Sequence, residues 1–148
     1  MALIGYVKLA PRYCLQKDLK MRLFSVFSAL FLAISLSMPA QAADLEFPAS
    51  GFVAEAEWVS GPVVGEESIL KITWADARTG ERTNPSNFRV SLWMPHHGHG
   101  SSPTRVEQIS AGIYRVRDMY FTMDGQWDVR VRVKNGDATD EKVFSVEL

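Results

Sequence analysis

Short runs in which apolar and polar residues alternate constrain this chain more than any other feature of its sequence. The clearest run covers residues 126–134, where one Trp and three Val residues alternate with charged residues. A period of two places successive side chains on opposite faces of a β-strand, so this strand has one apolar and one polar face. After residue 42, no window shows a sustained 3.6-residue apolar period of helical length. The pattern therefore predicts an all-β fold.

Further β-rich runs, each with one apolar face, are separated by turn-forming residues. The seven predicted strands cover residues 52–59, 68–74, 88–94, 104–109, 113–121, 126–134 and 142–148. Among the turn signals, Asp124-Gly125 and Asn135-Gly136 are typical of β-hairpins. About seven short antiparallel strands within roughly a hundred residues indicate an immunoglobulin-like β-sandwich, in which two sheets bury their apolar faces against each other.

The first forty-two residues have the order of a secretory signal peptide. Basic residues precede an apolar run at 23–36, and a small-x-small cleavage pattern ends at Ala42. The apolar run is shorter than the roughly 20 residues of a membrane-spanning helix, so we expect cleavage near Ala42 and no permanent membrane anchor. Translation starts either at Met1 or at Met21, and the sequence leaves both open. The pattern predicts a periplasmic or secreted product.

The predicted mature segment, residues 43–148, has the length of a single domain. Its 11 Lys/Arg and 16 Asp/Glu give a net charge of about −5, which argues against a nucleic-acid partner. The only cysteine, Cys14, precedes this segment, so neither a disulfide framework nor a Cys-ligated metal site is expected. We expect no enzyme, because the motifs of serine hydrolases, zinc proteases and phosphate-binding loops are missing from the sequence.

All three histidines of the chain lie within four positions, immediately after the predicted strand 88–94. The segment reads Trp93-Met94-Pro95-His96-His97-Gly98-His99-Gly100. Imidazole nitrogen and thioether sulfur both bind copper, and sulfur favours Cu(I), whereas Met is a poor zinc ligand. Pro95 ends the strand and the two glycines free the backbone, so the imidazoles can converge. The mixture of Met and His predicts a copper site, with Cu(I) favoured.

Further sulfur lies at Met119 and at Met123, which directly precedes the strand 126–134. Because loops gather at the ends of a sandwich, we expect Met123 to approach the histidines. The candidate metal ligands are therefore Met94, His96, His97, His99 and Met123.

Alternative interpretations of these residues stay open. Met94 and Met119 occupy apolar strand positions and are either core residues or ligands, and the same two interpretations stay open for Met123. A loop rich in His and Gly is also compatible with a flexible polar connection. In that case the domain binds no metal and contacts a protein partner through its end loops. The four tryptophans are interpreted as core or interface anchors.

Three sequence elements occur in order along the chain: Met94-Pro95-His96-His97-Gly98-His99-Gly100, then Gly112-Ile113-Tyr114, then Met123-Asp124-Gly125-Gln126-Trp127. Together they resemble the YtkA-like and FixH-like group of exported β-sandwich domains, over residues 68–148. The resemblance implies an immunoglobulin-like fold that faces the periplasm or cell exterior. It also implies a role in copper handling or in copper delivery to respiratory enzymes.

Carried over position by position, the ligands of that group correspond to Met94, His99 and Met123. His97 stands where a Met is common, which shifts the ligand set toward nitrogen and toward a different preference between Cu(I) and Cu(II). FixH-like members often retain a membrane anchor, so the cleavable signal is a second departure. The resemblance implies a periplasmic copper chaperone or accessory factor that receives copper from, or delivers it to, a partner protein.

Overall fold

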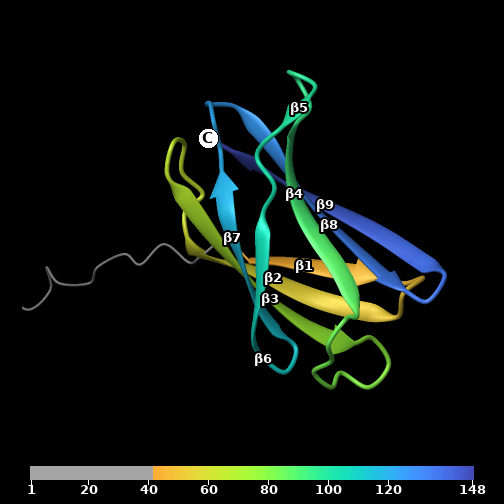
Figure 1. The fold of residues 1–148 in the computed structure, drawn as a ribbon. Coiled ribbons are helices and arrows are strands. Elements are labelled where there is room, and N and C mark those ends of the chain that lie inside the picture. The colour runs from red at the N-terminus through yellow and green to blue at the C-terminus, as the bar shows by residue number, and fades with distance from the viewer. Residues whose placement is uncertain (1–41) are drawn as a thin grey trace, which may run out of the picture. The chain divides into compact units, whose positions relative to one another are not determined.

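The structure, a computed structural model, describes residues 42–148, which form two antiparallel sheets around one hydrophobic core (Figure 1). The five-stranded sheet has the order β1-β2-β3-β7-β6, and the four-stranded sheet has the order β5-β4-β8-β9. Within these residues, no helix has the length and apolar character needed to cross a membrane. The predicted β-sandwich is confirmed, whereas residues 1–41 of the predicted signal peptide lie outside the described residues.

Residues 42–148 contain nine strands, two more than the sequence predicts. They are β1 (Ala42–Phe47), β2 (Phe52–Ser60), β3 (Glu67–Asp76), β4 (Asn87–Met94), β5 (His99–Gly100), β6 (Arg105–Ser110), β7 (Ile113–Tyr120), β8 (Gln126–Asn135) and β9 (Ala138–Glu147). The strand β1 has the same alternation as the others, but its place beside the predicted cleavage site concealed it. The strand β5 has only two residues, so it is too short to show the alternation from which a strand is predicted.

The two predicted hairpin dipeptides have different outcomes. Asn135-Gly136 forms the β8–β9 hairpin, in which Asn135 pairs with Ala138 and Gly136 has a φ of 58°. The hairpin prediction for Asp124-Gly125 was wrong, because this turn carries the chain from β7 in the five-stranded sheet to β8 in the four-stranded sheet. A dipeptide signals local backbone geometry and does not specify which sheet each flanking strand joins.

Aromatic side chains from both sheets fill the core. Trp74 of β3 is fully buried, with its ring centroid 5.0 Å from that of Phe47 and 5.0 Å from that of Phe88. Trp127 of β8 is also fully buried and packs edge-on against Phe121 at 5.6 Å. Such side chains bury large apolar areas, so they hold the two sheets together without a disulfide.

A β-bulge in β7 directs the chain toward the end of the sandwich. The β3–β7 register shifts between Ser68 and Leu70, and Asp118 has a φ of 57°, the only positive φ of a non-glycine residue within residues 42–148. Glu67 stabilises this bulge, because its carboxylate accepts hydrogen bonds from the Arg117 side chain at 3.2 Å and from the Asp118 N–H at 3.1 Å. The bulge changes the direction of the chain before it enters the turn that carries Met123.

We predict that Glu67→Gln lowers stability at neutral pH. The hydrogen bonds from Arg117 and from the Asp118 N–H hold the pKa of Glu67 below its ordinary value of 4.5. A carboxyl with a lowered folded-state pKa contributes stability that is present above the unfolded pKa and lost as pH falls through the folded one. The urea unfolding midpoints of wild type and variant should therefore differ at neutral pH and converge in acid.

The neighbouring exposed residue Glu66 provides the control. Glu66→Gln should leave the unfolding midpoint and its pH dependence close to those of wild type, since this carboxylate forms no ion pair within the described residues. If the unfolding midpoints of wild type and Glu67→Gln changed with pH in parallel, this would contradict a stabilising role for Glu67.

Candidate metal centre

The histidine segment forms the tight hairpin between β4 and β5. The carbonyl oxygen of Met94 accepts hydrogen bonds from the N–H groups of His97 at 3.3 Å and Gly98 at 2.9 Å. Gly98 has a φ of 68°, a left-handed conformation that glycine adopts without steric cost. The hairpin pairs Met94 with His99 across the two strands. Because directly opposite residues project from the same face, their side chains are neighbours.

The side chains of this hairpin differ in burial. His96 and His97 are exposed, and His99 is half-buried. Met94 is only 2% exposed and belongs to the core of the sandwich. The buried thioether of Met94 therefore lies on the core side of the hairpin, next to an imidazole that remains accessible from outside.

Two of the three imidazoles lie close together. The ring centroids of His97 and His99 are 5.9 Å apart. Two imidazoles that share one metal ion through nitrogen bonds of about 2 Å have centroids about 5 to 6.5 Å apart, so this spacing suits a common ligand. His96 has no ring contact with either of them in the described part of the chain.

A hydrogen bond sets which nitrogen of His99 is free. Its Nδ1 lies 3.2 Å from the carbonyl oxygen of Gly100, and a carbonyl can only accept. The bond therefore requires a proton on Nδ1, which leaves the lone pair of Nε2 for a metal ion in the neutral ring. Metal-binding histidines commonly have such a backbone partner.

The turn between β7 and β8 lies beside this hairpin. The ring of Trp127 stands 6.0 Å from that of His99 in an edge-on arrangement. Its Nε1–H donates a 3.0 Å hydrogen bond to the carbonyl oxygen of Met123. The side chain of Met123 is 36% exposed. Trp127 thus connects the turn that carries Met123 to the hairpin that carries His99.

A second contact joins the same two segments. A β-carbon built on Gly125 would stand 2.9 Å from Cε of Met94, so an alanine at this position would require the Met94 methyl group to shift. Gly125 also has a φ of 120°, which side-chain-bearing residues rarely adopt. The Met-x-Gly-x-Trp element therefore provides both the exposed Met123 and the space for the buried Met94.

The predicted ligands are thus placed unequally. The rings of His97 and His99 lie together, Met94 pairs with His99 across the hairpin, and Trp127 connects the turn of Met123 to His99. The ring of His96 contacts neither of the other two imidazoles. Within residues 42–148, no three side chains among His, Cys, Asp and Glu gather closely enough to hold a metal ion. Met119 is fully buried on β7 and belongs to the core.

Sequence reasoning missed the positioning roles of Gly125 and Trp127. Both belong to the third sequence element, Met-x-Gly-x-Trp, so the signal was present in the chain. Alternation alone could assign Trp127 only to the core, since the hairpin beside it comes from a distant part of the sequence.

The comparison with protein families gives a match that covers most of the sandwich. A family model described as YtkA-like matches residues 52–132, which is more than half of the chain. This range runs from β2 into β8 and includes both the histidine hairpin and the turn of Met123. No curated protein and no solved structure matches significantly.

We predict that Gly125→Ala destabilises the protein by about 1–3 kcal/mol, because the new methyl group meets the Met94 methyl in a strained backbone conformation. Urea unfolding gives the loss, and NMR of methyl-labelled Met reports the Met94 environment. Gly65→Ala is the matched control, since Gly65 has a φ of 80° with open space around it. Only Gly125→Ala should move the Met94 signal, and an unmoved signal would contradict the contact.

Proposed function

The chain belongs to the YtkA-like family, and from this premise we propose that it is an exported copper-binding protein. In this proposal it works in the periplasm or outside the cell as a chaperone or accessory factor for copper handling. The observation that supports it best is the convergence of two segments on Trp127, which sets the His97–His99 pair beside the turn of Met123.

The donor atoms suit a soft metal ion. Two imidazole nitrogens and one or two thioether sulfurs form a neutral set that favours Cu(I) over harder ions. His97 and His99 supply the nitrogens, Met123 supplies an accessible sulfur, and Met94 supplies a second sulfur from the core side. With His97 in place of a Met, the set also accommodates Cu(II), which prefers nitrogen and oxygen ligands.

The exposure of the ligands favours transfer over permanent storage. His97 is exposed and Met123 is 36% exposed, so ligands of a partner protein can reach the ion from outside while His99 still holds it. A surface site of this kind allows stepwise exchange of ligands between two proteins. The buried residues around it, Met94 and Trp127, keep the rim of the site rigid.

A copper titration tests this proposal. The protein purified after expression of the whole chain should bind one Cu(I) in competition with a chelator. The double variant His97→Ala/His99→Ala should lose more than about 100-fold in affinity. Loss of a residue that only hydrogen-bonds to a metal ligand already costs about 10–100-fold, and this variant removes two ligands. Met123→Leu should weaken Cu(I) binding more than Cu(II) binding, since it removes sulfur and keeps both imidazoles.

His96→Ala is the matched control for the histidine variants, because this exposed ring contacts neither of the other two. It should retain nearly full affinity. Equal losses in His96→Ala and His97→Ala/His99→Ala, or binding no tighter than that of a generic histidine peptide, would refute the site. A metal-free domain that binds a protein partner would then be the better interpretation.

Tryptophan fluorescence gives an independent prediction. The Trp127 ring lies 6.0 Å from that of His99, so bound Cu(II) should quench its emission. Part of this quenching should disappear in Trp127→Phe, while Trp93, which pairs with Gly100 next to His99, should still be quenched. A degree of quenching in Trp127→Phe equal to that of wild type would contradict a metal ion beside His99.

A further inference from the structure

Four cationic side chains share the outer face of the four-stranded sheet. Alternate residues of β8 point away from the core, as their exposure shows, and the same holds for β4. We name this set the basic strip; it consists of Arg89, Arg130, Arg132 and Lys134. No strand of the described residues covers this face. The positive charge of the basic strip contrasts with the net charge of residues 43–148, which is about −5.

The strand register arranges the strip as a grid. Arg89 lies directly opposite Arg132, and Asn87 lies directly opposite Lys134. Neighbouring strands are about 4.8 Å apart, and residues two positions apart on a strand are separated by about 6.7 Å. Like charges directly opposite each other destabilise a sheet, so a carboxylate bound between Arg89 and Arg132 would relieve their repulsion.

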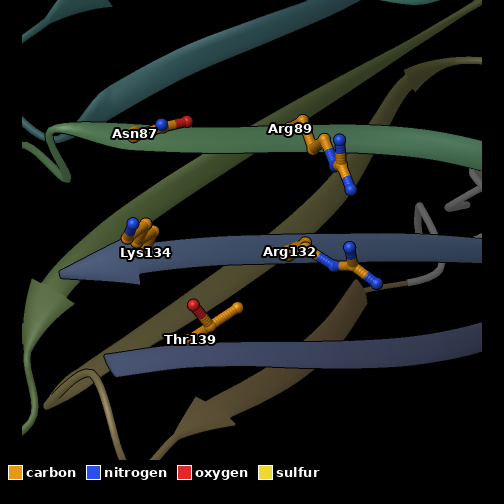
Figure 2. A pocket seen from close by; sticks show the side chains of 5 residues that line it. All are labelled: Asn87, Arg89, Arg132, Lys134 and Thr139. Atoms are coloured by element: carbon orange, nitrogen blue, oxygen red, sulfur yellow. The ribbon is translucent and has the colours of Figure 1, made fainter. Parts of the chain in front are cut away.

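Two of the four cations have no counter-charge in the described chain. Arg132 pairs with Glu141 at 2.6 Å, and Arg130 lies 3.6 Å from the carboxylate of Asp128. Within residues 42–148, Arg89 and Lys134 form no ion pair. They line a shallow hollow of about 260 Å³, whose polar wall is shown in Figure 2 and consists of Asn87, Arg89, Arg132, Lys134 and Thr139.

The strip extends from this hollow toward the metal centre. Arg130 stacks over the ring of Trp93, with its guanidinium carbon 4.9 Å from the ring centroid. Trp93 pairs with Gly100, which directly follows His99. Val143, opposite Arg130 on β9, is 47% exposed. Arg and Trp side chains on one flat face are enriched at the centres of protein interfaces.

We propose that the basic strip docks a partner protein whose surface carries carboxylates about 5–7 Å apart, matching the spacing of the grid. The identification of this partner as the donor or acceptor of copper rests on the proposed function; the docking itself does not require metal. A partner held on the strip and over Trp93 reaches the β4–β5 hairpin at Gly100 from the outer face, while the His99 side chain projects from the opposite face. The strip would therefore orient the partner for transfer at the adjacent hairpin.

The chemistry of the face favours a protein over other anionic ligands. All five residues of the hollow are exposed, so water screens a single small anion there, whereas several paired charges add up. The guanidinium group of an arginine can also donate two parallel hydrogen bonds to one carboxylate.

Hexaglutamate labelled with fluorescein is a defined probe for this surface, since alternate carboxylates of an extended chain have the spacing of the grid. In fluorescence anisotropy at low salt, metal-free wild type should bind it. Arg89→Ser/Lys134→Ser should weaken binding about tenfold, because two exposed cations that face the carboxylates are lost. Neither side chain has an ion-pair partner within residues 42–148, so the fold should be unaffected.

Arg78→Ser/Arg82→Ser is the matched control, since these exposed residues lie between β3 and β4 and the change in net charge is equal. It should retain wild-type binding. Equal weakening in both double variants, or no binding by wild type, would overturn the proposal, as would capture by phosphatidylserine vesicles that hexaglutamate does not compete away. His97→Ala/His99→Ala should still bind the peptide, which separates failure of the docking surface from failure of the metal site.

Discussion

The buried indole of Trp127 is the contact on which the end of this sandwich depends. Its ring packs against Phe121 of the preceding segment and against His99 of the β4–β5 hairpin, and its N–H fixes the carbonyl oxygen of Met123. One fully buried side chain thus connects the core to two loops that are about 25 residues apart in the chain. Because the ring is held on all sides, the loops around it have little freedom, and the candidate ligands keep their relative positions.

The two faces of the four-stranded sheet carry different kinds of side chain. Its inner face contributes valines and Met94 to the core, and its outer face carries the basic strip. The alternation that makes β8 a strand therefore also sorts its apolar residues from its cations. The proposed metal centre lies at the end of this sheet, and the strip leads to it along the outside. A docking surface and a transfer site can then act on the same partner without sharing a residue.

Much of the fold was predictable because the signals are local. All seven predicted strands exist, most with ends within two residues of those observed, and the largest difference is the start of β9. Three features escaped. The first is the strand β1, which lies beside the predicted cleavage site. The strand β5 has only two residues, and it exists because its neighbour Met94 pairs with His99. The turn at Asp124-Gly125 has hairpin chemistry, yet it connects two sheets because packing, not the dipeptide, decides where β8 lies.

The sequence by itself determined the all-β class, the faces of the strands and the kinds of donor atom available, since these follow from residue type and a period of two. Only the tertiary structure decided that His97 and His99 are neighbours while His96 is not, and that Met94 is buried against Gly125. It also decided that Arg89 lies opposite Arg132. The contacts of Met94 with Gly125 and of Arg89 with Arg132 join residues far apart in the chain, so they depend on strand register and sheet packing, which no local pattern specifies.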